Sequence, residues 1–215
     1  YSATLPCAAG RRSFTIEDRL ELPATRPPAA RILRYSCNMP VSDYSVIGRK
    51  VVFKGIFVLK ILYMSHDGEF LTHTAEIPFS QIADLDGLED KAECVIRLFP
   101  EDISLVPDES SDGRSFDLTF TAEAQVEAYI TRSLETVGDL YSTSMKSAVD
   151  IRPYSFTGSA GRTSKRQTIR DMIEVPVQVR QGCDAEVYFD AVRTARTDEG
   201  VECSANAPVR ALYMD

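Results

Sequence analysis

The sequence predicts an all-β protein, built as an antiparallel β-sandwich or a partly closed barrel of long strands. The main observation is alternation: in residues 116–130 the even positions are apolar or small, and the odd positions are mostly polar. A strand sends alternate residues to opposite faces, whereas a helix would spread both sets around its circumference. Residues 51–63 alternate in a similar way. Turn signals, such as Asp67-Gly68 and the run at 108–113, separate the strand-like segments.

The expected strands follow one another with little helical signal between them. In chain order they cover residues 14–22, 31–39, 51–63, 70–77, 94–106, 115–130, 147–156, 169–175, 187–194 and 201–213. Prolines at 23, 27 and 28 end the first strand, because proline has no amide hydrogen to donate to a sheet. Residues 80–85 allow one short helical turn, and residues 133–140 are ambiguous.

The alternation also assigns faces. We expect the following residues in the core: Phe53, Phe57, Leu59, Ile61, Phe116, Leu118, Phe120 and Val126. We expect Asp117, Glu123 and Glu127 in solvent. The second face of residues 51–64 carries lysines but is too apolar for simple exposure, so we expect a partner to cover part of it. The predicted partner-binding residues on this face are Val52, Ile56, Val58, Leu62 and Met64.

Two pairs of similar segments indicate an internal duplication of about 150 residues. Residues 15–23 read TIEDRLELP, and residues 168–176 read TIRDMIEVP. Residues 61–64 (ILYM) are echoed at 211–214 (ALYM). The predicted organisation is a tail of a preceding repeat at 1–13, a β domain at 14–156, a flexible basic linker at 157–167 and the start of a second, incomplete repeat at 168–215. Tandem units of this kind are more typical of scaffolds and binding arrays than of enzymes.

Charge and composition exclude several classes of function. The net charge is −8 and the pI is about 4.9, which argues against nucleic-acid binding. No apolar run approaches the roughly 18 residues of a membrane span, so we expect no membrane insertion. The five cysteines include no CxxC pair, which favours free thiols in a reducing compartment. One disulfide or an intermolecular bridge is the alternative.

No catalytic, cofactor or metal site is predicted. His66 and His73 are the two histidines, and neither stands in a pattern that marks a nucleophile–base pair or a metal site. Acidic residues are dispersed, although a pair of carboxylates that meets only in space, as in a glycosidase, would leave no trace in the sequence. Residues 158–165 lack the spacing of a phosphate-binding P-loop. The basic residues of this region offer either linker solubility or a docking patch: Arg162, Lys165, Arg166 and Arg170.

Four motifs follow one another along the chain: ELPATRPPAARILR at 21–34, VIGRKVVFKGIFVLKILYM at 46–64, AEIPFSQIADLDGL at 75–88 and GDLYST at 138–143. In this order they resemble the SPOCS domain of spore-coat and spore-morphogenesis proteins from endospore-forming Firmicutes, including the SipL type. They are similar to the family's opening segment, its long strand ending in LY, its E-I-P-F signature and its closing segment. Arg49 is a departure, since it separates Gly48 from Lys50. The second copy is more divergent and lacks the long apolar strand.

The resemblance implies a non-enzymatic scaffold or adaptor of the spore envelope that acts through protein–protein contacts. Its expected partners are other spore-coat or envelope proteins, with self-association possible. Its expected location is the mother-cell cytoplasm and the spore coat, or else the spore or cell surface. Two other functions stay open: a module of an extracellular self-assembling structure, and a glycan- or peptidoglycan-binding module. The absence of tryptophan weighs against the glycan-binding module.

Overall fold

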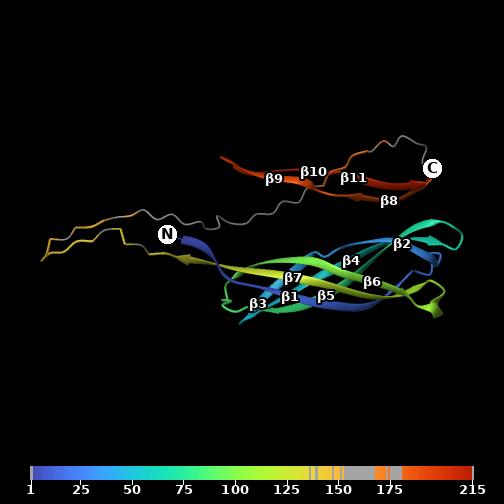
Figure 1. Ribbon diagram of the computed structural model, residues 1–215, viewed down its shortest axis with the longest axis horizontal. Helices are drawn as coiled ribbons and strands as arrows, with labels where there is room; N and C mark the ends of the chain where they lie inside the picture. The colour runs from blue at the N-terminus through green and yellow to red at the C-terminus, as the bar shows by residue number, and fades with distance from the viewer. Residues whose placement is uncertain are drawn as a thin grey trace.

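Eleven β-strands make up most of the described protein (Figure 1). The computed structural model describes residues 2–135, 137–138, 140–146, 148–150, 152, 168–172, 174 and 181–214. The strands of the main body are β1 (Ser2–Glu21), β2 (Ala29–Asn38), β3 (Val41–Ile47), β4 (Lys50–Ser65), β5 (Phe70–Asp84), β6 (Glu93–Pro107) and β7 (Ser115–Ser133). Four shorter strands follow: β8 (Gln181–Val187), β9 (Asp190–Thr197), β10 (Gly200–Asn206) and β11 (Val209–Met214). No α-helix occurs within the described ranges, which agrees with the predicted all-β class.

The main body is a sandwich of two antiparallel sheets that do not close into a barrel. Sheet A has the strand order β1-β7-β6, with β7 in the middle. Sheet B is centred on β4, which pairs with β5 along one edge and with β2 and β3, one after the other, along its other edge. Pro40 separates β2 from β3, and its carbonyl accepts a hydrogen bond from the amide of Ile56 at 3.2 Å. β2 and β3 therefore complete one edge of the sheet between them.

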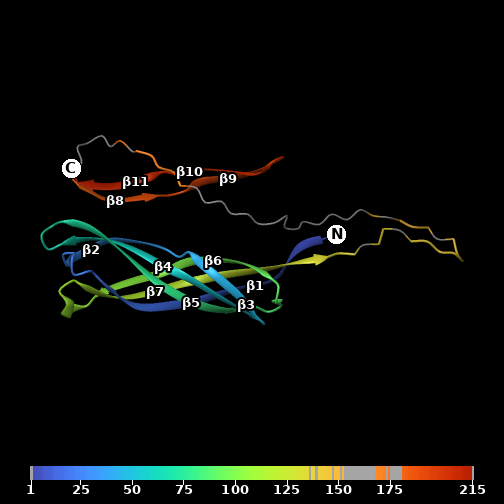
Figure 2. The ribbon, with the colours of Figure 1, turned by 180° about the vertical axis from the view of Figure 1, so that it is seen from behind.

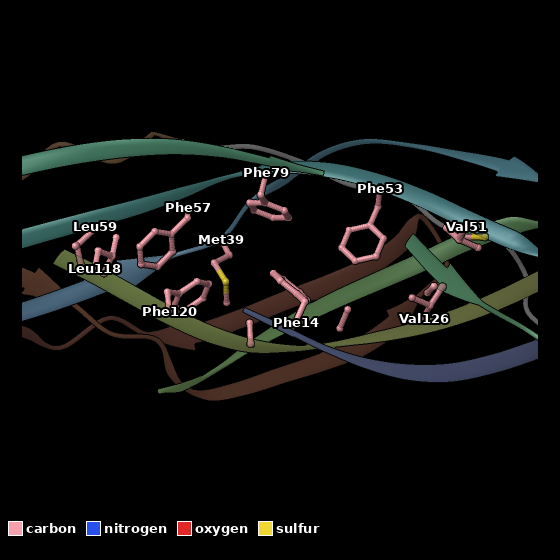
Figure 3. Close-up of a cluster of buried hydrophobic side chains, with 14 of the residues drawn as sticks. Phe14, Met39, Val51, Phe53, Phe57, Leu59, Phe79, Leu118, Phe120 and Val126 are labelled. Atoms are coloured by element: carbon pink, nitrogen blue, oxygen red, sulfur yellow. The ribbon is translucent and has the colours of Figure 1, made fainter. Parts of the chain in front are cut away.

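The core fills the space between the sheets, as the alternation predicts. Every residue assigned to the core is buried, and none has more than 2% of its surface exposed. Aromatic rings link the layers: Phe57 of sheet B stacks on Phe120 of sheet A with 4.0 Å between ring centroids. Phe14 of β1 lies 5.7 Å from Phe79 and 6.3 Å from Phe53, both on sheet B (Figure 3). The predicted face assignment of β4 and β7 is confirmed for these residues.

The prediction of exposure was correct for only one of three acids. Asp117 is exposed, but Glu123 and Glu127 are half-buried. They lie on the outer face of β7, where side chains of the neighbouring strands β1 and β6 partly cover them. Arg97 pairs with Glu127 at 3.2 Å, and the hydroxyl of Tyr129 donates to the same carboxylate at 2.9 Å. The hydrogen bond from Tyr129 first, and then the positive charge of Arg97, hold the pKa of Glu127 below its usual range.

Several predicted elements were wrong. Residues 80–85 form no helical turn, because β5 runs on to Asp84 and stays paired with β4. β3 was not predicted, since its apolar residues alternate weakly. The strand predicted at 187–194 is interrupted after Val187. Residues 169–172 and 174 form no strand, and the described part of the strand predicted at 147–156 forms none either.

Residues 2–13, predicted as the tail of a preceding repeat, are the first half of β1. Ser2 to Phe14 pair residue by residue with the second half of β7, with one bulge near Pro6. Gly10 lies against the end of β5, where a β-carbon would stand 2.5 Å from a methyl group of Leu85. This segment is therefore part of the sandwich. The linker predicted at 157–167 lies outside the described residues.

Candidate functional site

The outer face of sheet B is the candidate site. It consists of the outward-facing residues of β4 and their neighbours on β2, β3 and β5. Alternation along β4 places the five predicted partner-binding residues on this one face, together with Lys54 and Lys60. Leu62 is 2% exposed, whereas the other four are partly exposed. The face is thus an apolar strip that includes two lysines, and it is more deeply buried at its Leu62 end.

The covered end lies beneath strand β8. The carboxylate of Asp184 forms an ion pair with the ammonium of Lys60, and Glu186 forms one with the guanidinium of Arg34. Arg34 is the cross-strand partner of Leu62, so both ion pairs lie beside the buried leucine. Figures 1 and 2 show β8 and β11 as a layer beside the sandwich, next to β2. One end of the predicted face is therefore in contact with the chain's own later residues.

Burial of the two acids is the notable property of this contact. The side chain of Asp184 is 4% exposed and that of Glu186 is 14% exposed. A carboxylate that leaves water loses several kcal/mol of solvation unless a cation or hydrogen-bond donor replaces it. Lys60 supplies this replacement to Asp184, and Arg34 and the hydroxyl of Tyr188 both donate to Oε2 of Glu186, whereas Oε1 of Glu186 is buried without a hydrogen-bond partner. The electrostatic match is a condition for covering this end of the face.

The other end of the face is open. Val52 and Ile56 are partly exposed, and Ile82, the cross-strand partner of Val52, is 46% exposed. Lys54 is exposed between them. This end offers apolar side chains and a positive charge on a flat, twisted sheet, a surface suited to another protein rather than to a small molecule.

The basic patch predicted further along the chain is only partly visible. Arg162, Lys165 and Arg166 lie outside the described residues. Arg170 is described, is exposed and belongs to no strand. Sequence reasoning missed Arg34, Asp184 and Glu186. The alternation of acids in the segment 184–186 was a signal for the last two, but the strand was expected to begin only at Val187.

A cleft of about 480 Å³ lies at one end of the sandwich, between β2, the β4–β5 turn and the β6–β7 loop. His66 lines it together with Asp108, Glu109 and Asp112. No hydrogen bond joins His66 to these acids in the described structure. Asp108 instead accepts hydrogen bonds from Ser110, which lower its pKa, and pairs with Arg19. Asp108 is thus engaged in shaping the loop itself.

The remaining histidine and the cysteines are dispersed over the described part of the chain. His73 has a lowered pKa, mainly because it is partly buried, with a further contribution from Arg26. The cysteines that the structure describes are free thiols: Cys7, Cys37, Cys94 and Cys203. The described ranges contain no group of three or more His, Cys, Asp or Glu residues placed to hold a metal ion. They also contain no helix that is both long and apolar enough to span a membrane.

Comparison with known families gives one match. Residues 28–107 match the family described as SipL, SPOCS domain. Over these residues the chain is similar to the SPOCS domain. The match agrees with the resemblance found in the sequence motifs and marks the chain as sporulation-related. No curated protein and no solved structure matches it.

The matched residues correspond to a defined part of the fold. They begin just before β2 and end with β6. The match therefore includes every strand of sheet B, but from sheet A it includes β6 alone. The outer face of sheet B therefore lies within the matched part of the SPOCS domain. β1 and β7, which complete sheet A and bury the inner face of β4, lie outside it.

Proposed function

We propose that this chain is a non-enzymatic scaffold or adaptor of the bacterial spore envelope and acts through protein–protein contacts. The observation that carries the proposal is the SPOCS match over sheet B. The expected partners are other coat or envelope proteins, met in the mother-cell cytoplasm and at the coat surface. The contact surface is the outer face of sheet B.

The physical support comes from the open end of that face. Apolar side chains that stay in contact with water represent unused hydrophobic free energy, about 25 cal/mol for each Å² that a partner would cover. Val52, Ile56 and Ile82 form such a group on the central and edge strands. Because β4 and β5 are fully paired with each other, this surface is rigid and already formed before a partner arrives.

The role is tested by following a fluorescent fusion of the full chain in a sporulating host. We expect the fusion to collect around the forespore, and Ile56→Glu to abolish this because it places a charge on the contact face. Thr119→Glu is the matched control, since Thr119 is exposed on the outer face of sheet A. A wild-type fusion that stays diffuse throughout sporulation would contradict the envelope role. Normal localisation of Ile56→Glu would contradict the choice of face.

A further inference from the structure

The pairing of β8–β11 reproduces the pairing of β2–β4 at a constant offset of 150 positions. Corresponding pairs are Ile47–Lys50 and Thr197–Gly200, Cys37–Leu59 and Val187–Val209, and Ile32–Tyr63 and Gly182–Tyr213. Irregularities of register also correspond, since the shift between Ile32 and Arg34 recurs 150 positions later, opposite Leu212 and Tyr213. Register depends on every pair along a ladder, so a chance agreement over four strands would be exceptional. Residues 181–214 therefore repeat the strand pairing of β2–β4, although as two separate two-stranded sheets, β8 with β11 and β9 with β10. We call β2–β4 the first half-sheet and β8–β11 the second half-sheet.

This equivalence identifies which faces meet. Asp184 stands at the position of Arg34, and Glu186 stands at the position of Ser36. Both therefore lie on the face of the second half-sheet that corresponds to the outer face of sheet B. Their ion pairs with Lys60 and Arg34 show that the two half-sheets meet outer face to outer face.

The two faces differ in charge at the contact. Position 34 carries a base, and its equivalent, position 184, carries an acid. Two copies of the first face in the same arrangement would bring Arg34 of one copy against Lys60 of the other, and like charges in a partly dry contact oppose association. An acidic strand on a basic face removes this repulsion. Because an acid replaces the base at the equivalent position, the first face binds the second face in preference to another copy of itself.

We propose that the Lys60–Leu62 end of the outer face of sheet B is a docking site for an acidic strand, and that its occupant is β8 of the same chain. Successive half-sheets of this type would then pack outer face to outer face, with the charge at positions 34 and 184 selecting the pairing. The inference shares its surface with the proposed function but does not depend on a spore-envelope role. Val52 and Ile56, at the other end of the face, stay available to a separate partner.

Carbodiimide cross-linking of the purified full chain tests the contact, because this reagent joins a lysine amine to a carboxylate only when the two touch. We expect a link between Lys60 and Asp184. Lys50 and Asp84 provide an exposed control pair between β4 and β5, with 4.0 Å between the amine nitrogen and the carboxylate oxygen. The link between positions 60 and 184 should form alongside this control link. The control link without the other would overturn the proposal.

Variants make the test specific. Lys60→Asp combined with Asp184→Lys should restore a link between positions 60 and 184, because the charges are exchanged but still opposite. Arg34→Lys should create a new link to Glu186, since lysine supplies the amine that arginine lacks. Failure of both variants, with the control link between Lys50 and Asp84 retained, would contradict the docking geometry.

A mixture of isotopically heavy and light chains distinguishes docking within one chain from docking between chains. Links in which both residues are heavy or both are light, without mixed links, support the proposal. Mixed heavy–light links at the share that random exchange between chains gives would overturn the assignment of β8 of the same chain as the occupant. Neither result depends on localisation in the sporulating cell, so the docking site and the proposed function can fail separately.

Discussion

Truncation of Phe120 to alanine should reveal how much of the fold depends on contact between the two sheets. Phe120 is fully buried in the middle of β7, and its ring lies 4.0 Å from that of Phe57 with 20° between the planes. Phe→Ala at such a site removes the transfer free energy of the ring and leaves a cavity, which together cost about 3–5 kcal/mol. For a chain of this size, the melting temperature should fall by on the order of 10 °C.

The assay is urea unfolding followed by circular dichroism, because the chain has no tryptophan to report by fluorescence. Asp117→Ala is the control, since Asp117 lies on the same strand but is exposed. The double variant with Phe57→Ala should be destabilised by about 0.5–1.5 kcal/mol less than the sum of the single variants, which is the coupling expected of a stacked pair. If Phe120→Ala unfolds at the same urea concentration as Asp117→Ala, the assignment of this face to the core is refuted.

Three further outcomes follow from particular sites, and each is measured by urea or thermal unfolding. Gly113→Ala should strongly lower the free energy of unfolding, because Gly113 has φ +76° and a β-carbon would stand 2.1 Å from the carbonyl oxygen of Ala29. Gly48→Ala is the control that isolates backbone strain, since Gly48 has φ +59° but lies in open space. Equal losses of stability in the two variants would contradict the role of the clash. Because the pKa of His73 is lowered in the folded chain, the unfolded chain binds a proton more readily. Stability should therefore fall as pH drops below about 6.5 and level off below the folded pKa. His73→Gln should flatten this dependence of stability on pH, and an unchanged dependence would show that another group causes it. The pKa of Asp108 is lowered, first by its hydrogen bonds with Ser110. This carboxylate therefore contributes stability that is present above the unfolded pKa near 3.9 and is lost as pH falls through the folded pKa. Asp108→Asn should remove this loss of stability in acid, and a variant that still shows it would point to another carboxylate.

Failure of prediction was concentrated where the sequence pattern is weak. β3 alternates weakly and was not predicted, yet it forms a strand because it pairs with the first half of the long strand β4. Residues 80–85 contain no strong alternation, and the pairing of Val51 with Ala83 makes them strand all the same. In both cases backbone hydrogen bonds to β4 outweigh the weak strand preference of the segment itself.

The candidate site was half visible in the sequence. Alternation showed that Val52, Ile56 and Leu62 share a face and that this face is too apolar to stay uncovered, because strand periodicity alone decides sidedness. It could not show what covers Leu62, since Asp184 lies more than a hundred residues away and its strand was assigned too late in the chain.

The sequence by itself determined the all-β class, the inner faces of β4 and β7 and the SPOCS resemblance, because each rests on the order of residues within one segment. The tertiary structure alone decided that residues 2–13 complete sheet A and that β2 and β3 share one edge of β4. It also decided that an acidic strand lies on Arg34 and Lys60. These features join segments far apart in the chain. Their free energy comes from burial and charge pairing between segments, which no periodicity within a single segment records.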